Sequence, residues 1–158
     1  MKNGKYGFQI FILLAAAFPF WLPLVLWLGY ALMGWMGGRD SAAGYEKRWE
    51  IEFSSEWKEV CHADSGPSFH GDGMRYGIYE NVSEGSIAEL GCSFVRGKND
   101  AVAEEFQDVT EALETEDKNQ PDFTKDFAWA RLAKEDGSFL ILLFFPEDNR
   151  MFLAEVMI

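Results

Sequence analysis

Basic residues and histidines are scarce in this chain, and that scarcity limits the partners it can have. Among 158 residues there are 14 Lys and Arg against 26 Asp and Glu, so the formal net charge is −12 at pH 7, and there are only two histidines. Nucleic acids and anionic lipid headgroups are bound by clustered cations, so we expect neither as a charge-driven partner. Divalent cations and basic proteins remain compatible with this charge.

Sequence motifs of several functional classes are also missing. No glycine-rich phosphate-binding loop precedes a helical pattern, and no Gly-x-Ser-x-Gly elbow occurs. The alternating acidic residues of an EF-hand are missing too, and there is neither an internal repeat nor a low-complexity tract. These absences argue against nucleotide chemistry, serine hydrolysis and EF-hand calcium binding.

Cysteine is represented by Cys61 and Cys92 only. In an oxidising compartment we expect a Cys61–Cys92 disulfide, which would close a loop of about thirty residues and contribute about 3 to 4 kcal/mol by chain-entropy arguments. In a reducing compartment they would be two buried thiols. The sequence leaves both alternatives open.

An uncharged apolar run near the start of the chain is its most conspicuous feature. Residues 7–38 carry no charge, and Gln9 is their only strongly polar side chain. A helix needs about 20 apolar residues to cross a bilayer, whereas the apolar part of a signal peptide has about 7 to 15. We therefore predict an uncleaved membrane anchor in residues 1–38 that contacts lipid through residues 7–36. The basic tail before it favours a single-pass protein whose C-terminal domain is extracytoplasmic, although the charges on the two sides do not decide orientation.

The remainder of the chain reads as a linker, residues 39–44, and an acidic α+β domain, residues 45–158. The run Phe139–Phe145 is apolar throughout, which predicts a central strand covered on both faces. Residues 86–94 fit a strand or a short helix. Spacing predicts a helix at 100–114 and strands at 58–64, 74–80, 127–133 and 151–158. For residues 45–60 we favour a helix, although residues 49–53 alternate as in a strand. The predicted fold class is α+β: one transmembrane helix followed by a small two-layer domain, an antiparallel sheet with one or two helices.

Both histidines lie beside the loop between the first two predicted strands. His62 and Asp64 form one His-x-Asp pair, and His70 and Asp72 form a second. Residues two apart on extended backbone project to the same side, and imidazole with carboxylate suits zinc, iron or manganese. These four residues are therefore the metal-site hypothesis. We expect no resident cofactor otherwise.

The interpretation that we prefer for this loop is a tight turn. Its glycines would supply positive φ angles, and its polar side chains would cap the turn through hydrogen bonds. Phe69 is an aromatic residue on a loop, where it could cover the strands. The ligand or loop candidates are Asp64, Ser65, Phe69, His70, Gly71, Asp72 and Gly73.

The same loop resembles that of a set of small uncharacterised bacterial proteins, many of them membrane-anchored or secreted. In those proteins a segment of the form Asp-x-x-Gly-Gly-Phe-His-Gly-Asp-Gly precedes a strand. Here Asp64 and the run from Phe69 to Gly73 match that form, whereas Pro67 and Ser68 replace its two glycines. The resemblance implies kinship and a bacterial envelope setting, and it implies no activity.

These features predict binding rather than catalysis. We expect the acidic domain to bind a protein or another envelope partner, in the manner of an inhibitor or an immunity protein. The alternative is a metal-dependent enzyme that uses the cluster of His62, Asp64, His70 and Asp72.

Overall fold

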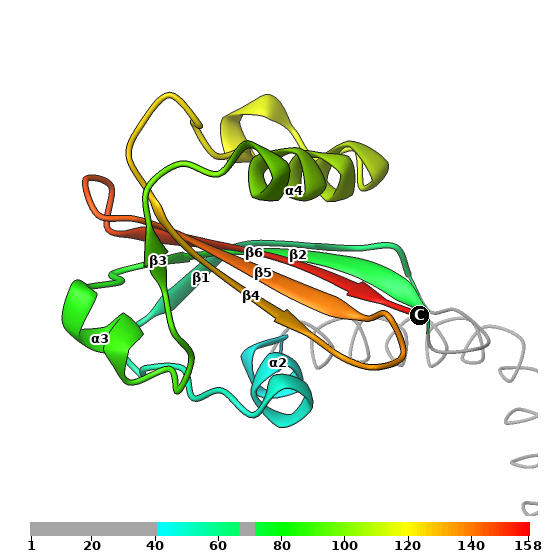
Figure 1. Cartoon of the computed structure of the whole chain (residues 1–158), viewed down its shortest axis with the longest axis horizontal. Helices are drawn as coiled ribbons and strands as arrows, with labels where there is room; N and C mark the ends of the chain where they lie inside the picture. Colours follow the sequence, from blue (N-terminus) through cyan, green and yellow to red (C-terminus); the bar gives the residue numbers. More distant parts are fainter. Residues whose placement is uncertain (1–40, 67–71) are drawn as a thin grey trace, which may run out of the picture. The chain divides into compact units, whose positions relative to one another are not determined.

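Six strands form one antiparallel sheet in the computed structural model of the chain, which describes residues 41–66 and 72–158. Their order across the sheet is β1-β2-β6-β5-β4-β3, and Figure 1 shows them side by side. The strands are β1 (Lys58–Asp64), β2 (Gly73–Glu80), β3 (Val95–Arg96), β4 (Ala128–Ala133), β5 (Phe139–Phe145) and β6 (Arg150–Met157).

Helices cover both faces of this sheet (Figure 1). Helix α4 (Asp100–Ala112) lies on one face, whereas α2 (Ser41–Trp49) and α3 (Glu84–Ala88) lie on the other; a 3-10 turn, η1 (Asp117–Asn119), follows α4. The predicted two-layer arrangement is therefore wrong, because the helices on its two faces and the sheet between them make three layers. The cause is that the central strands are apolar on both sides, so each side requires a cover.

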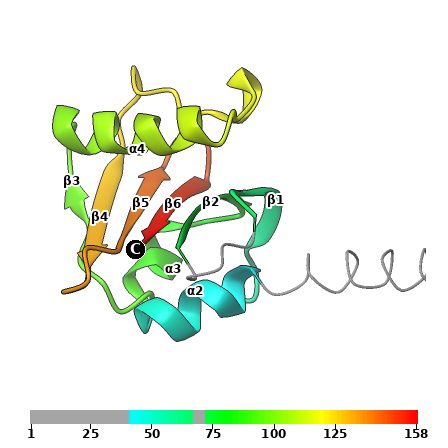
Figure 2. The same ribbon diagram turned by 90° about the vertical axis from the view of Figure 1, so that its right-hand side faces the viewer.

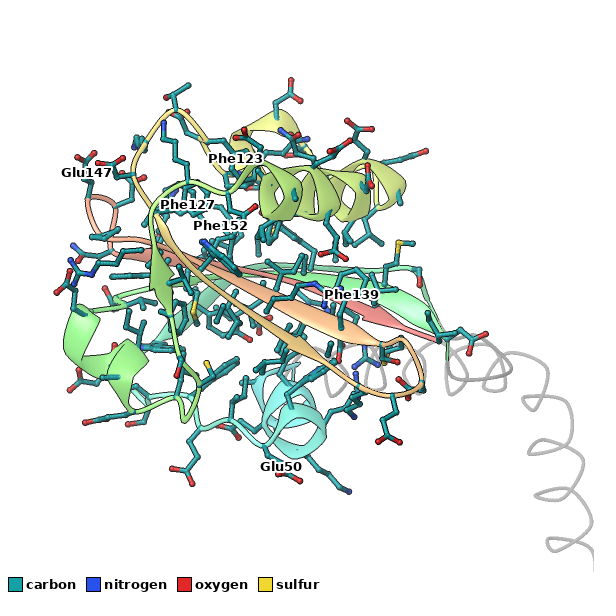
Figure 3. All side chains as sticks on the ribbon, viewed as in Figure 1. Glu50, Phe123, Phe127, Phe139, Glu147 and Phe152 are labelled. Carbon is teal, nitrogen blue, oxygen red and sulfur yellow. The ribbon has the colours of Figure 1, made fainter. Side chains whose placement is uncertain are left out.

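Alternate residues of the central strands build two separate cores. Leu140, Leu142 and Phe144 of β5 pack with Tyr45 and Trp49 of α2 in the first core. The intervening residues of β5 pack with Val102, Phe106 and Val109 of α4 in the second. Figure 3 labels three aromatic residues of this second core, Phe123, Phe127 and Phe152, near one end of α4.

The predicted strands are confirmed to within a residue or so at each end. β5 is one of the two central strands, and Leu140 to Phe145 are buried, as its uninterrupted apolar run predicts. The turn before it is formed as expected: Asp136 accepts a hydrogen bond from the Ser138 N–H at 2.8 Å, and Gly137 has a φ of 91°. The helix predicted at 100–114 is also confirmed as α4, whose first turn is capped by Asn99.

The predicted helix over residues 45–60 is only partly present. Helix α2 begins at Ser41, within the predicted linker, and ends at Trp49. Glu50 then takes a φ of 55°, a left-handed conformation that commonly ends helices. Residues Ala42–Ile158 form one compact unit.

The predicted transmembrane architecture is corrected by the structure. Within residues 41–66 and 72–158, no helix has the length and apolar character needed to cross a bilayer. Residues 7–38, where we placed the anchor, lie outside the described residues. The single-pass membrane topology and the extracytoplasmic localisation depended on that helix, and both are withdrawn with it.

Candidate functional site

The residues that enter and leave the β1–β2 loop are engaged in turn hydrogen bonds. Asp64 Oδ1 accepts from the Gly66 N–H at 2.7 Å, and Ser65 Oγ accepts from the Met74 N–H at 3.0 Å. Gly66 has a φ of 81°. A Cβ on Gly73 would lie 2.9 Å from Ser65 Oγ, so a side chain there would require the Ser65 hydroxyl to shift. In this part of the loop, the glycines and polar side chains therefore hold the turn.

His62 lies on the edge strand β1 between two carboxylates. Its Nδ1 is 3.4 Å from Glu59 Oε1, and its Nε2 is 3.5 Å from Asp64 Oδ2. Asp72 is exposed. Across the described residues, no group of three or more His, Cys, Asp and Glu side chains is placed to hold a metal ion. Phe69, His70 and Gly71 lie outside the described residues, so the predicted four-ligand set is described only for His62, Asp64 and Asp72.

The two cysteines are not joined by a disulfide, which was one of the two alternatives left open by the sequence. Both Cys61 and Cys92 are free thiols. Cys61 packs against the core under α4, whereas Cys92 packs against the core on the opposite face of the sheet. The sheet thus separates the two sulfur atoms. Burial raises the pKa of both thiols.

A pocket of about 510 Å³ lies beside α3, and we call it the α3 pocket. Its walls are mostly apolar: Ile87, Phe127, Ala128 and Phe144 are buried, and Phe94 is half-buried. Among the described residues, the lining consists of Glu84, Ile87, Ala88, Cys92, Phe94, Arg96, Gly97, Asp126, Phe127, Ala128, Phe144 and Pro146. A hollow of this size and character is typical of ligand-binding sites.

Local hydrogen bonds fix the helix that forms one side of the α3 pocket. Ser83 and Ser86 make a capping box, in which each side chain accepts a hydrogen bond from the other residue's backbone N–H. The Trp57 Nε1–H donates to Ser86 Oγ at 2.9 Å, which ties α3 to the segment before β1. Helix α3 has only five residues, so these contacts rather than its length hold it in place.

Two of the charged side chains at the α3 pocket form an ion pair with each other, and a third does not. Arg96 Nη2 donates to Glu84 Oε1 at 2.9 Å in an exposed ion pair. The Asp126 carboxylate is exposed and has no hydrogen-bond or ion-pair partner within the described part of the chain. The pocket therefore combines an apolar interior with one unpaired negative charge.

A second polar cluster is buried beneath α2. The Glu155 side chain of β6 is completely inaccessible to solvent. It accepts hydrogen bonds from Arg48 Nη1 at 2.6 and 2.7 Å and from Trp49 Nε1 at 2.6 Å, and Arg75 Nη1 lies 3.7 Å away. Because these donors surround the carboxylate, it has no free side to offer a ligand. The cluster therefore attaches α2 to the sheet.

Sequence reasoning missed both the α3 pocket and the Glu155 cluster. The pocket is lined by five short stretches of chain, from α3, the segment around β3, the start of β4, the end of β5 and the turn after it. No local motif marks such a site. Glu155 did have a signal: it is the only charged residue in the apolar run 151–158.

Comparison with family models, curated proteins and solved structures found no match for this chain.

Proposed function

We propose that the domain of residues 42–158 is a protein-binding module whose recognition site is the α3 pocket. In this proposal the pocket receives an apolar side chain of the partner. The observation that carries it is the combination of apolar walls, a volume of about 510 Å³ and one unpaired carboxylate at the rim.

The size and walls of the α3 pocket suit a large apolar anchor. Phe94, Phe127 and Phe144 offer aromatic surface, and Ile87 offers aliphatic surface. Burying one aromatic or large aliphatic side chain contributes about 1.5 to 3 kcal/mol. In protein interfaces such anchors carry much of the binding energy.

The charges favour a partner that is basic around its anchor. Asp126 is available for an ion pair, and the whole chain has a net charge of −12. A negative surface raises the association rate of a positive partner and disfavours acidic ones. A cationic residue next to the apolar anchor therefore matches the pocket and its rim.

The lining chemistry favours binding over catalysis. The part of the lining that the structure describes includes neither histidine, serine nor lysine, and Cys92 is its only thiol or hydroxyl nucleophile. Burial raises the pKa of this thiol, so at neutral pH it is present as the thiol rather than as the reactive thiolate. A nucleophile without an adjacent base is weak.

Selection of displayed peptides tests this function. The probe is a library of random twelve-residue peptides, selected on the full chain and then measured individually by fluorescence anisotropy. Ala88→Trp places an indole at the pocket from the exposed end of α3, whereas Ala112→Trp places the same group at the exposed end of α4. Both positions tolerate a large side chain because both are on the surface.

The expected result is a set of peptides that share an apolar residue next to Lys or Arg. Ala88→Trp should weaken their binding at least a hundredfold, and Ala112→Trp should change it less than twofold. Equal binding by wild type and Ala88→Trp would contradict the pocket assignment. Failure to enrich any peptide would contradict the proposed function itself.

The metal-dependent alternative depends on His70, because His62, Asp64 and Asp72 do not form a metal-holding group within the described residues. Its test is titration of Zn²⁺ into the full chain by calorimetry, with His62→Ala and His70→Ala as variants. Stoichiometric binding that both variants abolish would support a metal site at this loop. Binding that neither variant changes would remove these residues from consideration.

A further inference from the structure

We propose that the partner of the α3 pocket binds as an extended segment that adds a strand to the outer edge of β3. This inference rests on the function proposed above and specifies its geometry. Strand addition supplies affinity through backbone hydrogen bonds and specificity through pockets for alternate side chains. The edge of β3 and the α3 pocket provide these two elements next to each other.

Strand β3 is the last strand of the sheet on this side. Figure 2 shows the edge from the side, with β4 as the neighbour of β3 and no other drawn element beyond β3 within the described residues. The strand has only two residues, Val95 and Arg96. An outer edge leaves backbone donors and acceptors open to another chain, and a strand this short offers few of them.

The pairing of β3 with β4 shows which backbone groups are open. Val95 pairs with Trp129 and Arg96 with Ala128, and the Gly97 N–H donates to the Phe127 carbonyl oxygen at 3.1 Å. Successive residues of an antiparallel strand direct their backbone groups to opposite sides. Since Gly97 is bonded to the β4 side, the N–H and C=O of Arg96 point away from β4, towards the open edge.

The side chains alternate in a way that connects this edge to the pocket. Phe94 and Arg96 line the α3 pocket, whereas Val95, which is 50% exposed, lies opposite Trp129 on the other face. In a strand added beside β3, every second side chain would face the same way as Arg96. One of these side chains would therefore enter the α3 pocket.

The opposite edge of the sheet carries a feature of its own that disfavours strand addition. Strand β1 has an irregular register between Glu59 and Cys61, and a bulge of this kind is a feature that blunts sheet edges against pairing. At β3 the nearby Asp126 carboxylate can pair with a Lys or Arg of the added segment. The occupant is thus an extended basic segment of another protein with an apolar anchor.

Two substitutions at Arg96 test the inference. Arg96→Pro removes the outward N–H, and proline is tolerated on edge strands where its nitrogen faces solvent. Arg96→Ala is the matched control, because it removes the same side chain and its ion pair with Glu84 but keeps the N–H. Both variants of the full chain are compared with wild type for binding of one enriched peptide, and near-UV circular dichroism checks that they fold alike.

If the inference is right, Arg96→Pro binds the peptide about tenfold more weakly than Arg96→Ala, which corresponds to one lost hydrogen bond. Methylation of a single peptide backbone nitrogen should give a similar loss at one position of the peptide and almost none at its neighbours. If Arg96→Pro and Arg96→Ala bind equally while Ala88→Trp abolishes binding, strand addition is wrong and the pocket function stands. If Ala88→Trp also binds normally, both proposals fall.

Discussion

Replacing Glu155 by alanine should loosen the attachment of α2 to the sheet. The carboxylate accepts three short hydrogen bonds, two from Arg48 and one from Trp49, and it is closed off from solvent. Arg75 provides a further positive charge at 3.7 Å. Alanine removes the common acceptor of all these groups.

The expected loss of stability follows from what is left behind. The Trp49 N–H becomes a buried donor without its acceptor, which costs about 1 to 3 kcal/mol. The side chains of Arg48 and Arg75 are 27% and 34% exposed, so they recover part of their hydration and the penalty for their charges is reduced. Breaking a buried ion pair by removing one partner typically costs about 3 to 5 kcal/mol, and we expect a value near the lower end, about 3 kcal/mol.

Urea unfolding of the full chain, followed by far-UV circular dichroism, measures this loss. Glu84→Ala is the control, because it removes one partner of an exposed ion pair and such pairs contribute at most about 1 kcal/mol. A Glu155→Ala variant within about 1 kcal/mol of wild type would refute the assignment of Glu155 as the anchor of α2.

Three further predictions concern buried tyrosine and cysteine side chains. Tyr45→Phe should stabilise the fold by about 1 kcal/mol, because the Tyr45 hydroxyl is buried without a hydrogen-bond partner in the described part of the chain. Tyr76→Phe should destabilise the fold by a similar amount, because the Tyr76 hydroxyl donates to a backbone carbonyl. Urea midpoints that move in the same direction for both variants would contradict this prediction. Burial is the largest cause that raises the pKa of both tyrosines in the folded state, so from about pH 10 the unfolded chain loses these protons before the folded chain does. The free energy of unfolding should therefore be highest below about pH 10 and fall above it. Equal urea midpoints at pH 8 and pH 11 would contradict this. Cys61 and Cys92 should react with iodoacetamide at pH 7 more slowly in the folded chain than in urea, because burial raises the pKa of each thiol. The intact mass should correspond to two reduced thiols, whereas a mass lower by two hydrogens would indicate a disulfide.

The strands were predictable because their signals are local. The apolar run of β5 requires cover on both faces, and the alternation of β1 shows one face that is packed and one that is exposed. The number of layers was not deduced, because it depends on which helix returns to which face. That choice is made by contacts far apart in the sequence, such as those of Tyr45 and Phe106 with opposite sides of the sheet.

The end of α2 shows why a regular apolar spacing can mislead. Tyr45, Trp49, Phe53 and Trp57 recur every four residues, which suggested one long helix. All four pack in the same core, and the Phe53 ring lies 5.3 Å from that of Trp57, but the chain leaves the helix at Glu50. The spacing therefore reports burial on one side of the sheet rather than helical conformation.

The candidate site was not predictable from motifs for a related reason. The histidine and glycine residues near the β1–β2 loop drew attention because they are dense in the sequence. Of those described, Gly66 donates a turn hydrogen bond to Asp64, and His62 lies between two carboxylates. The α3 pocket has no such density: Arg96 and Asp126 are 30 positions apart in the chain and line the same pocket because β3 pairs with β4. A binding site that is assembled by sheet pairing can be recognised in the folded structure but not from a short sequence motif.

The most direct test of the α3 pocket uses the two cysteines of one chain as probe and control. Cys92 lines the pocket, whereas Cys61 packs on the opposite face of the sheet. Alkylation by iodoacetamide is followed residue by residue with mass spectrometry, with and without a saturating amount of an enriched peptide. The account predicts that the peptide slows modification of Cys92 at least tenfold and leaves that of Cys61 unchanged; an unchanged rate at Cys92 would contradict it.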